Sequence, residues 1–303
     1  MISWIVYFVL PKELAPSVRL HQYSVFTFLG ALCGSVANYS PVKIISRDNS
    51  LLRRARAVRD GRVDELIFVE GLRLCEEALH SGLKIEAVIY SEQIAKKDRA
   101  AKLIGELEHA ADKSATVNEK LLASISYTKT PQGIIVLASR PSITESEFKR
   151  RQPAKPLLVI LHGINNPVNV GAIIRTAEAA GATGVITTAG TADPFSPKSL
   201  RGAMGAAFRL PFWIGGDYSQ VIEWCRKQRI QTVCAAINGA ESYTEIDWQQ
   251  PAALIMGSES KGLSAEEIAL SDAAVRIPMK GSTESLNVAV AAGILLYEAS
   301  RQR

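Results

Sequence analysis

The sequence lacks the features that define several special classes of protein. Its 303 residues include only four cysteines and four histidines, with no C-x-x-C spacing and no neighbouring histidine pair, which argues against zinc and against a disulfide scaffold. With 47% hydrophobic and 21% charged residues, the composition is neither that of a disordered chain nor that of a collagen. We therefore expect two globular domains with buried, reduced thiols, no metal and a cytoplasmic location.

Long apolar runs are also missing. Spanning a bilayer takes roughly 18 to 20 apolar residues, and the runs at residues 2–10 and 24–37 are both shorter. No basic residue precedes the first run, as one would in a signal peptide. We expect residues 1–42 to be an extension of unknown role, for which a start codon assigned too far upstream is one explanation and membrane association a minor alternative.

Excess charge is small overall but concentrated. The chain has a formal charge of +5, and residues 43–62 alone hold seven basic and two acidic side chains, a difference of +5. The basic residues there are Lys43, Arg47, Arg53, Arg54, Arg56, Arg59 and Arg62. Charge alone leaves two interpretations open, a solvated helix face and a patch that contacts the backbone of a nucleic acid.

Residues 43–139 alternate short apolar runs with helical patterns. Strands are expected at 66–69, 85–90 and 133–138, and helices at 51–60, 72–79, 95–111 and 118–124. This alternation predicts a small α/β sandwich. Prolines and mixed charges then mark residues 140–155 as a linker.

Residues 156–303 have the pattern of an α/β domain with a parallel sheet and helices on both faces. Apolar runs lie at 157–161, 184–188, 230–235, 252–256 and 274–277, separated by helical segments that include a final helix at 286–300. In such sheets ligands bind beyond the carboxyl ends of the strands, which directs attention to the loops after residues 161, 256 and 277. His162 lies there too, and we interpret it as a structural histidine.

The loop after residue 161 leads into a helix with a polar start. Asn169 is expected to cap that helix, and Gly171 to let another backbone approach its first turn. Arg175 is a charge at the edge of an apolar helix, and taken alone it would most commonly pair with Glu178.

The other two loops have their own polar residues. Glu259 lies between Gly257 and Gly262, which suggests a tight loop that fixes its carboxylate. After residue 277, Ser285 is expected to cap the last helix and Asn287 to project from its first turn. No G-x-G-x-x-G fingerprint or P-loop follows the first strand, so a dinucleotide-dependent enzyme is the least favoured hypothesis.

Together the three loops resemble the motifs of the SpoU family of RNA ribose 2′-O-methyltransferases, within the knotted SPOUT superfamily. The segment beginning Phe68-Val-Glu-Gly and the segment Thr130-Pro-Gln-Gly-Ile resemble a ribosomal-protein-L30e-like RNA-binding domain that often precedes the catalytic one. The resemblance implies an L30e-like domain at 43–139 and, at 156–303, a methyltransferase domain with a trefoil knot. It also implies a homodimer packed through the knotted domain.

The resemblance further implies S-adenosylmethionine as methyl donor and RNA as substrate, with ribosomal RNA favoured over transfer RNA. The residues implied for catalysis are Asn169, Arg175, Glu259, Ser285 and Asn287, those for donor binding are Gly257, Ile277, Ser285 and Leu286, and those for RNA are Arg53, Arg54 and Arg56. The family account makes the arginine a general base, but a guanidinium rarely gives up its proton. Arg175 could therefore act as a base next to phosphates or carboxylates, or remain a cation and polarise the 2′-oxygen.

An inactive RNA-binding or ribosome-assembly protein on the same scaffold is the alternative from a different class. The complete polar set argues against it, because a protein that only binds would not need all of those positions. The target nucleotide, and whether both subunits contribute to one site, cannot be predicted from the sequence.

Overall fold

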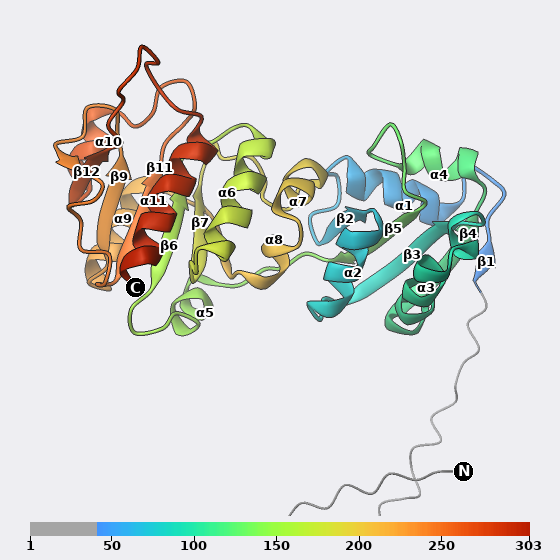
Figure 1. Cartoon of the computed structure of the whole chain (residues 1–303). Helices are drawn as coiled ribbons and strands as arrows, with labels where there is room; N and C mark the ends of the chain where they lie inside the picture. The colour runs from blue at the N-terminus through green and yellow to red at the C-terminus, as the bar shows by residue number, and fades with distance from the viewer. Residues whose placement is uncertain (1–40) are drawn as a thin grey trace, which may run out of the picture. The chain divides into compact units, whose positions relative to one another are not determined.

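A computed structural model describes residues 41–303, which form two separate β-sheets, each covered by helices (Figure 1). The expected extension, including Cys33, lies outside the described residues apart from its last two positions. No helix within 41–303 is long and apolar enough to cross a membrane, and no group of acidic, cysteine or histidine side chains there could hold a metal ion. The three described cysteines, Cys75, Cys225 and Cys234, are buried, and burial raises the pKa of Cys225 to about 12.

The first sheet has five strands in the order β1-β4-β3-β5-β2. The strand β5 runs antiparallel to both β2 and β3, and the other pairs are parallel. Its strands are β1 (Val42–Lys43), β2 (Leu66–Glu70), β3 (Ile85–Ser91), β4 (Ala111–Val117) and β5 (Ile134–Ser139). Its helices are α1 (Ser50–Arg59), α2 (Leu72–His80), η1 (Ile94–Lys96), α3 (Asp98–Ala110) and α4 (Glu119–Ile125).

Alternating side chains place helices on both faces of this sheet. In β2, Phe68 packs with residues of α1 and α4, whereas Ile67 and Val69 pack with residues of α2 and α3. The predicted α/β sandwich is confirmed. The strand β4 was not predicted, because its exposed Asp112 and Lys113 interrupt the apolar run that marks the other strands.

The second sheet has seven strands, all parallel, in the order β10-β12-β9-β11-β6-β7-β8. Its strands are β6 (Leu157–Leu161), β7 (Gly184–Thr188), β8 (Phe212–Gly216), β9 (Gln231–Ala235), β10 (Glu241–Ser242), β11 (Ala252–Met256) and β12 (Ala273–Arg276). Its helices are α5 (Glu145–Arg150), α6 (Pro167–Ala179), α7 (Pro197–Ala203), α8 (Ala206–Arg209), α9 (Tyr218–Lys227), α10 (Ala265–Leu270) and α11 (Val288–Gln302). The predicted parallel sheet with helices on both faces is confirmed.

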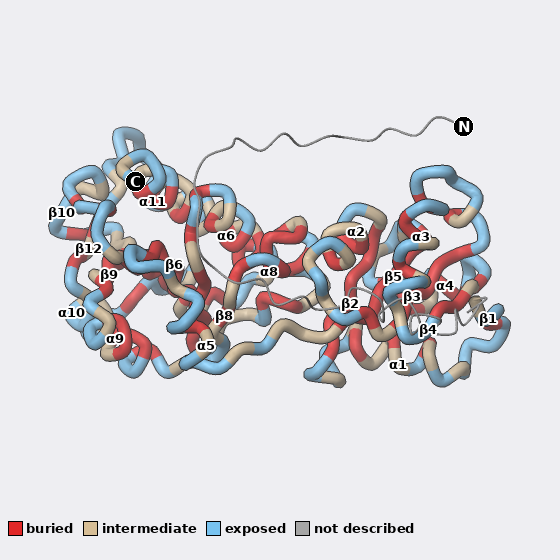
Figure 2. Tube along the Cα trace, turned by 90° about the horizontal axis from the view of Figure 1, so that it is seen from below, coloured by how far each residue is buried: buried red, intermediate tan, exposed pale blue. Residues whose placement is uncertain are grey.

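Strand β6 is buried on both sides (Figure 2). Leu157, Val159 and Leu161 pack against α6 and α11, and Leu158 and Ile160 pack against α9. The same second face receives α5, which was not predicted: it lies inside the proline-rich interval expected as a linker, and its Phe148 is fully buried.

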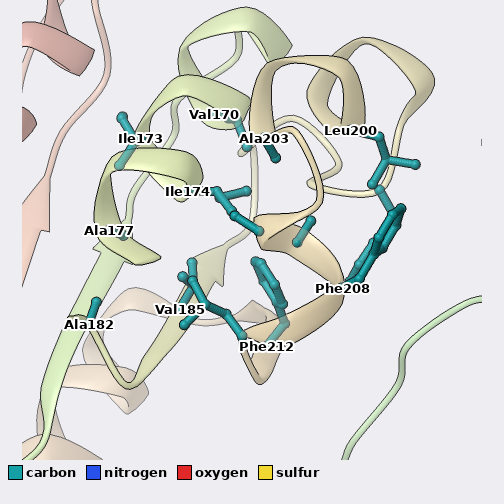
Figure 3. Packing of buried hydrophobic residues seen from close by; sticks show 14 of the residues in the cluster. Val170, Ile173, Ile174, Ala177, Ala182, Val185, Leu200, Ala203, Phe208 and Phe212 are labelled. Atoms are coloured by element: carbon teal, nitrogen blue, oxygen red, sulfur yellow. The ribbon is translucent and has the colours of Figure 1, made fainter. Parts of the chain in front are cut away.

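Helices α6 and α7 touch through glycine. A Cβ atom on Gly171 would lie 2.3 Å from the carbonyl oxygen of Ser199 and 2.9 Å from Cα of Gly202, so only glycine fits there. Apolar side chains of the same helices, among them Val170 and Ala203, complete the contact (Figure 3). The prediction that Gly171 admits another backbone is confirmed, and the approaching backbone is that of α7.

Candidate functional site

The candidate site lies at the carboxyl edge of the seven-stranded sheet. Because the central strands β6, β11, β9 and β12 are parallel neighbours, the loops that follow them share one edge. Three of these loops contain the polar residues that the sequence singled out.

A chain of side-chain hydrogen bonds connects the three loops. Asn287 Nδ2 donates to Asn169 Oδ1 at 3.3 Å, and Asn169 Nδ2 donates to Glu259 Oε1 at 3.0 Å. The backbone N–H of Asn166 donates to the same Glu259 oxygen at 3.3 Å. Residues 118 and 90 positions apart in the sequence are thereby joined in one cluster.

The hydrogen bonds of this cluster have a fixed direction. The backbone N–H of Ala289 donates to Asn287 Oδ1 at 2.9 Å, which leaves the amide nitrogen of Asn287 to face Asn169. The oxygen of Asn169 is then occupied, so its nitrogen faces Glu259, which must accept. The start of α11 thus fixes the orientation of the carboxylate at the far end.

The caps of α6 and α11 differ from the sequence prediction. Asn166, not Asn169, caps α6, because its side chain accepts from Val168 N and Pro167 occupies the first helical position. Asn169 lies one turn inside the helix and is only 8% exposed. Asn287 itself caps α11, so the expected cap at Ser285 is wrong and Ser285 lies exposed before the helix.

The loop after β11 doubles back tightly. A Cβ atom on Gly257 would lie 2.7 Å from the carbonyl carbon of Gly262, and Ser258 and Gly262 form a bridge. Gly262 has a φ of +64°, a conformation that favours glycine. The expectation of a tight loop that presents Glu259 is confirmed.

The segment between β12 and α11 offers unpaired backbone. From Pro278 to Leu286 no peptide group has a hydrogen-bond partner among residues 41–303. Ser285 lies in this segment, which also exposes 38% of Met279. Free peptide groups beside an apolar side chain suit a ligand that has a flat apolar ring with polar edges.

Arg175 stands apart from the cluster. It is exposed and has no ion pair or hydrogen bond within residues 41–303, because the carboxylate of Glu178, its expected alternative partner, pairs with Arg209 instead. Six residues along an α-helix correspond to about 9 Å and a turn of about 120° away from Asn169. The structure therefore unites Asn169, Glu259 and Asn287 but not Arg175 or Ser285.

A fourth loop, residues 236–240 after β9, was overlooked in the sequence. Its Ile237 is 70% exposed, and Arg276 Nη1 holds the loop against β12 by donating to the carbonyl oxygens of Gly239 at 2.7 Å and Ala240 at 2.6 Å. Strand 230–235 was predicted, so the rule that ligands bind at carboxyl ends would have included this loop.

The three arginines expected to contact RNA differ in their surroundings. Arg54 forms two hydrogen bonds with Glu86, at 2.5 and 2.8 Å, which raise the pKa of the guanidinium above its ordinary value. Arg56 donates to the backbone oxygen of Arg47 at 2.8 Å. Only Arg53 is exposed without a partner among the described residues.

The two L30e-like sequence segments meet in space. The buried carboxylate of Glu70 accepts the backbone N–H groups of Tyr127 at 2.8 Å and Thr128 at 3.2 Å. Gln132 Oε1 accepts from Leu72 N at 3.0 Å and thus caps α2. These motif residues hold the loop before β5 against the start of α2, where Tyr127 is 44% exposed.

Comparison with known proteins decides the family. Residues 156–297 match the model of the SpoU rRNA Methylase family, and residues 52–136 match an MRM3-like substrate binding domain. The chain is 31% identical over 230 residues, 76% of this chain and 86% of the relative, to the 23S rRNA (guanosine(2553)-2′-O)-methyltransferase RlmP of Bacillus subtilis. The chain belongs to the SpoU rRNA methylase family.

Other SpoU family members resemble the chain over most of its length. An uncharacterised tRNA/rRNA methyltransferase of Synechocystis sp. is 33% identical over 266 residues, which covers 86% of this chain and 94% of that protein. The crystal structure of an AdoMet-bound rRNA methyltransferase from Sinorhizobium meliloti matches with a TM-score of 0.75 and 31% identity, covering 86% of this chain and 97% of that one. The SpoU methyltransferase AviRb from Streptomyces viridochromogenes, in complex with AdoMet, matches with a TM-score of 0.74 and 28% identity, over 84% and 98%.

Proposed function

We propose that this protein transfers a methyl group from S-adenosylmethionine to a ribose 2′-hydroxyl of ribosomal RNA. The observation that carries the proposal is the directed chain from Asn287 through Asn169 to Glu259, in a chain that belongs to the SpoU family. Relatives named as 23S rRNA 2′-O-methyltransferases support ribosomal RNA as the substrate.

The residues around the loops fit the methyl donor. When bound, S-adenosylmethionine supplies a methyl group on a positively charged sulfur. The peptide groups of residues 278–286, with Leu286 at their end, would hold polar edges of the donor, and Ile277 and Met279 its apolar parts. The tight turn at Gly257 would leave room beside Glu259, whose carboxylate adds negative charge near the sulfur.

Positioning accounts for the chemistry that this chain contributes. Asn169, Glu259 and Asn287 would fix the loops so that the 2′-oxygen lies in line with the methyl group, an arrangement that can be worth about 7 to 11 kcal/mol in favourable intramolecular cases. Ser285 would contact the donor. Arg175 would stay a cation and polarise the 2′-oxygen as its proton leaves, because no described neighbour favours the deprotonated form.

The separation of Arg175 from Glu259 supports a homodimer in which one copy supplies Arg175 to the site of the other. Exposed apolar side chains offer an interface: Val290 and Tyr297, seven residues apart on one face of α11, are 53% and 57% exposed. Val168 at the start of α6 is 46% exposed. We expect the dimer to pack through these two helices.

Three further expectations follow from membership of the family. They are a trefoil knot in the catalytic domain, a cytoplasmic location, and a division into an RNA-binding domain at 43–139, a connecting segment at 140–155 and a methyltransferase domain at 156–303. The two separate sheets and the two family matches, at 52–136 and 156–297, support the division.

The substrate class is tested with tritiated S-adenosylmethionine and unmodified transcripts of ribosomal and transfer RNA. We expect the purified protein to label the ribosomal transcript. Label in the transfer RNA alone would make it a tRNA methyltransferase. RNA binding without label in either transcript would favour an inactive assembly protein.

RNA binding by the basic segment can be assigned to individual arginines. Replacing Arg53, Arg54 and Arg56 together should weaken RNA binding and flatten its salt dependence. Among single variants, Arg53→Ala should reduce the slope of log K against log salt by about one per phosphate contact and leave Tm unchanged, because Arg53 has no described partner. Arg54→Ala is the matched control: it breaks the Glu86 pair and should lower Tm, with less effect on the slope. An unchanged slope in the triple variant would contradict the patch.

A further inference from the structure

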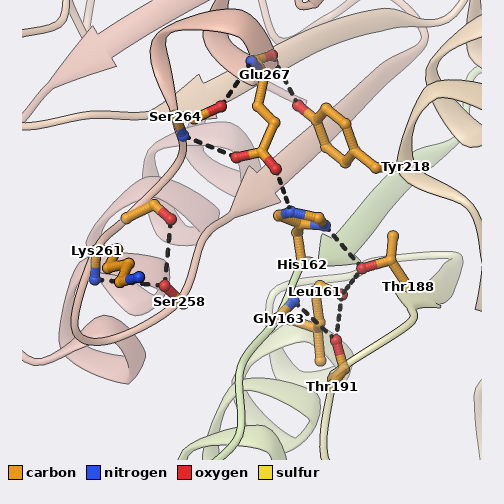
Figure 4. A network of polar contacts seen from close by, with 11 residues as sticks. Leu161, His162, Gly163, Thr188, Thr191, Tyr218, Ser258, Lys261, Ser264 and Glu267 are labelled. Atoms are coloured by element: carbon orange, nitrogen blue, oxygen red, sulfur yellow. Dashed lines mark hydrogen bonds and ion pairs between the residues drawn. The ribbon is translucent and has the colours of Figure 1, made fainter.

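A second polar network lies at the start of the loop after β6, centred on His162 (Figure 4). The imidazole Nδ1 lies 2.8 Å from Thr188 Oγ1, and Nε2 lies 2.9 Å from Glu267 Oε1. The ring also packs against Tyr218, with 4.4 Å between ring centroids. The side chain is 19% exposed, so these contacts account for most of its surroundings.

The protonation of this network follows from its partners. The other oxygen of Glu267 accepts the backbone N–H of Ser264 at 2.7 Å. Burial disfavours the charged carboxylate, but the hydrogen bonds from Ser264 and His162 outweigh it, so the pKa of Glu267 lies below its ordinary value. A carboxylate requires a donor, which places a proton on His162 Nε2; in the neutral ring, Nδ1 then accepts from the hydroxyl of Thr188. Every polar atom in the network is satisfied.

This network and Glu259 join the same two loops at different points. Glu267 connects His162, the first residue after β6, to Ser264, the last residue before α10. Glu259, in the middle of the loop after β11, connects to Asn166 at the end of the loop after β6. Two carboxylates therefore fix one loop over the other, and removing one leaves the loops held by a single contact.

The sheet itself does not hold these loops. The ladder between β6 and β11 ends where the N–H of His162 donates to Met256 O at 2.9 Å. Beyond that bond, the position of Glu259 depends on the tight turn at Gly257 and on the two carboxylate contacts. A shift of about 1 Å at a reacting centre can cost about 100-fold in rate, so small loop movements matter.

We propose that His162 and Glu267 are positioning residues that hold the loop after β11 so that Glu259 stays hydrogen-bonded to Asn169 and Asn166. The inference rests on the proposed function, because it assigns to that reaction two residues that touch neither the donor nor the RNA. It gives the histidine at the strand end a role beyond the purely structural one that its sequence context predicts.

Variants at His162 test the proposal against a simple stabilising role. His162→Ala should lower kcat for methyl transfer about 10- to 100-fold, with dissociation constants for S-adenosylmethionine and RNA changed by less than about two-fold. His162→Gln should recover most of the rate, since its amide N–H can reach Glu267. Thr232→Val is the matched control: Thr232 is 1% exposed and bonds Asp272 at 2.8 Å at the opposite edge of the sheet, so its loss should lower Tm but not kcat.

Hydrogen exchange provides a readout that needs no catalysis. The N–H of Asn166 donates to Glu259, so its exchange should be faster in His162→Ala and unchanged in Thr232→Val. Unchanged exchange at Asn166, or a kcat within two-fold of wild type, would overturn the inference. A wild-type protein that labels no RNA would instead contradict the proposed function, while the exchange data would still show whether His162 holds the loop.

Discussion

Replacing Arg175 with alanine is expected to lower kcat for methyl transfer about 100- to 1000-fold, the range found when one preorganised charged or hydrogen-bonding group is removed from a reacting centre. Its side chain has no partner within residues 41–303, so the change breaks no described contact. The Tm and the dissociation constant for S-adenosylmethionine should therefore stay at wild-type values. Single-turnover transfer, isothermal calorimetry and thermal unfolding on the same preparation check all three.

A matched variant separates the role of Arg175 from a general loss of positive charge. Arg226 is exposed on α9, which packs on the other face of the sheet, and it pairs only with Glu223 three residues away. Arg226→Ala should retain full activity, because exposed pairs of this kind contribute little. Near-wild-type single-turnover rates in Arg175→Ala would show that Arg175 takes no part in the reaction.

Replacing Asn287 with aspartate should lower kcat about 10- to 100-fold without destabilising the fold. Aspartate caps a helix as well as asparagine does, so the bond from Ala289 N to residue 287 survives. The new oxygen would face Asn169 Oδ1, and Asn169 could avoid this repulsion only by turning its own oxygen toward Glu259. Either arrangement breaks the directed chain and leaves acceptors facing each other, at about 1 to 3 kcal/mol.

The control for this variant is Asn118→Asp. Asn118 caps α4 by accepting from Leu121 N at 2.8 Å, and no other hydrogen bond of its side chain is present within the described residues. Both caps should therefore tolerate aspartate in thermal unfolding, and only Asn287→Asp should lose activity. Equal activity of the two variants would contradict a directional role for Asn287.

Much of the fold was predictable because its signals are local. Fully buried strands such as β6 and β11 appear in the sequence as short apolar runs between helical patterns, and the capping box from Ser264 to Glu267 marks the start of α10. The strand β4 and the helix α5 were missed for local reasons as well. Exposed charges interrupt β4, and flanking prolines concealed α5, whose burial depends on a distant strand and helix.

The site was predictable in its members but not in its geometry. Asn166 and Asn169 are both good caps, and only the rule that proline prefers the first helical position selects Asn166. Ser285 and Asn287 present the same ambiguity before α11. Which asparagine caps a helix and which faces Glu259 is decided by contacts across 90 and 118 residues, and a local pattern contains no information about these.

The central claim is that the methyl group goes to a ribose oxygen, and alkaline hydrolysis of labelled RNA tests it most directly. Alkali cleaves RNA through the free 2′-hydroxyl, so a 2′-O-methylated nucleotide protects the bond that follows it. After incubation of unmodified ribosomal RNA with the protein and tritiated S-adenosylmethionine, we expect the label in alkali-resistant dinucleotides. Label in mononucleotides would place the methyl group on a base and contradict the account.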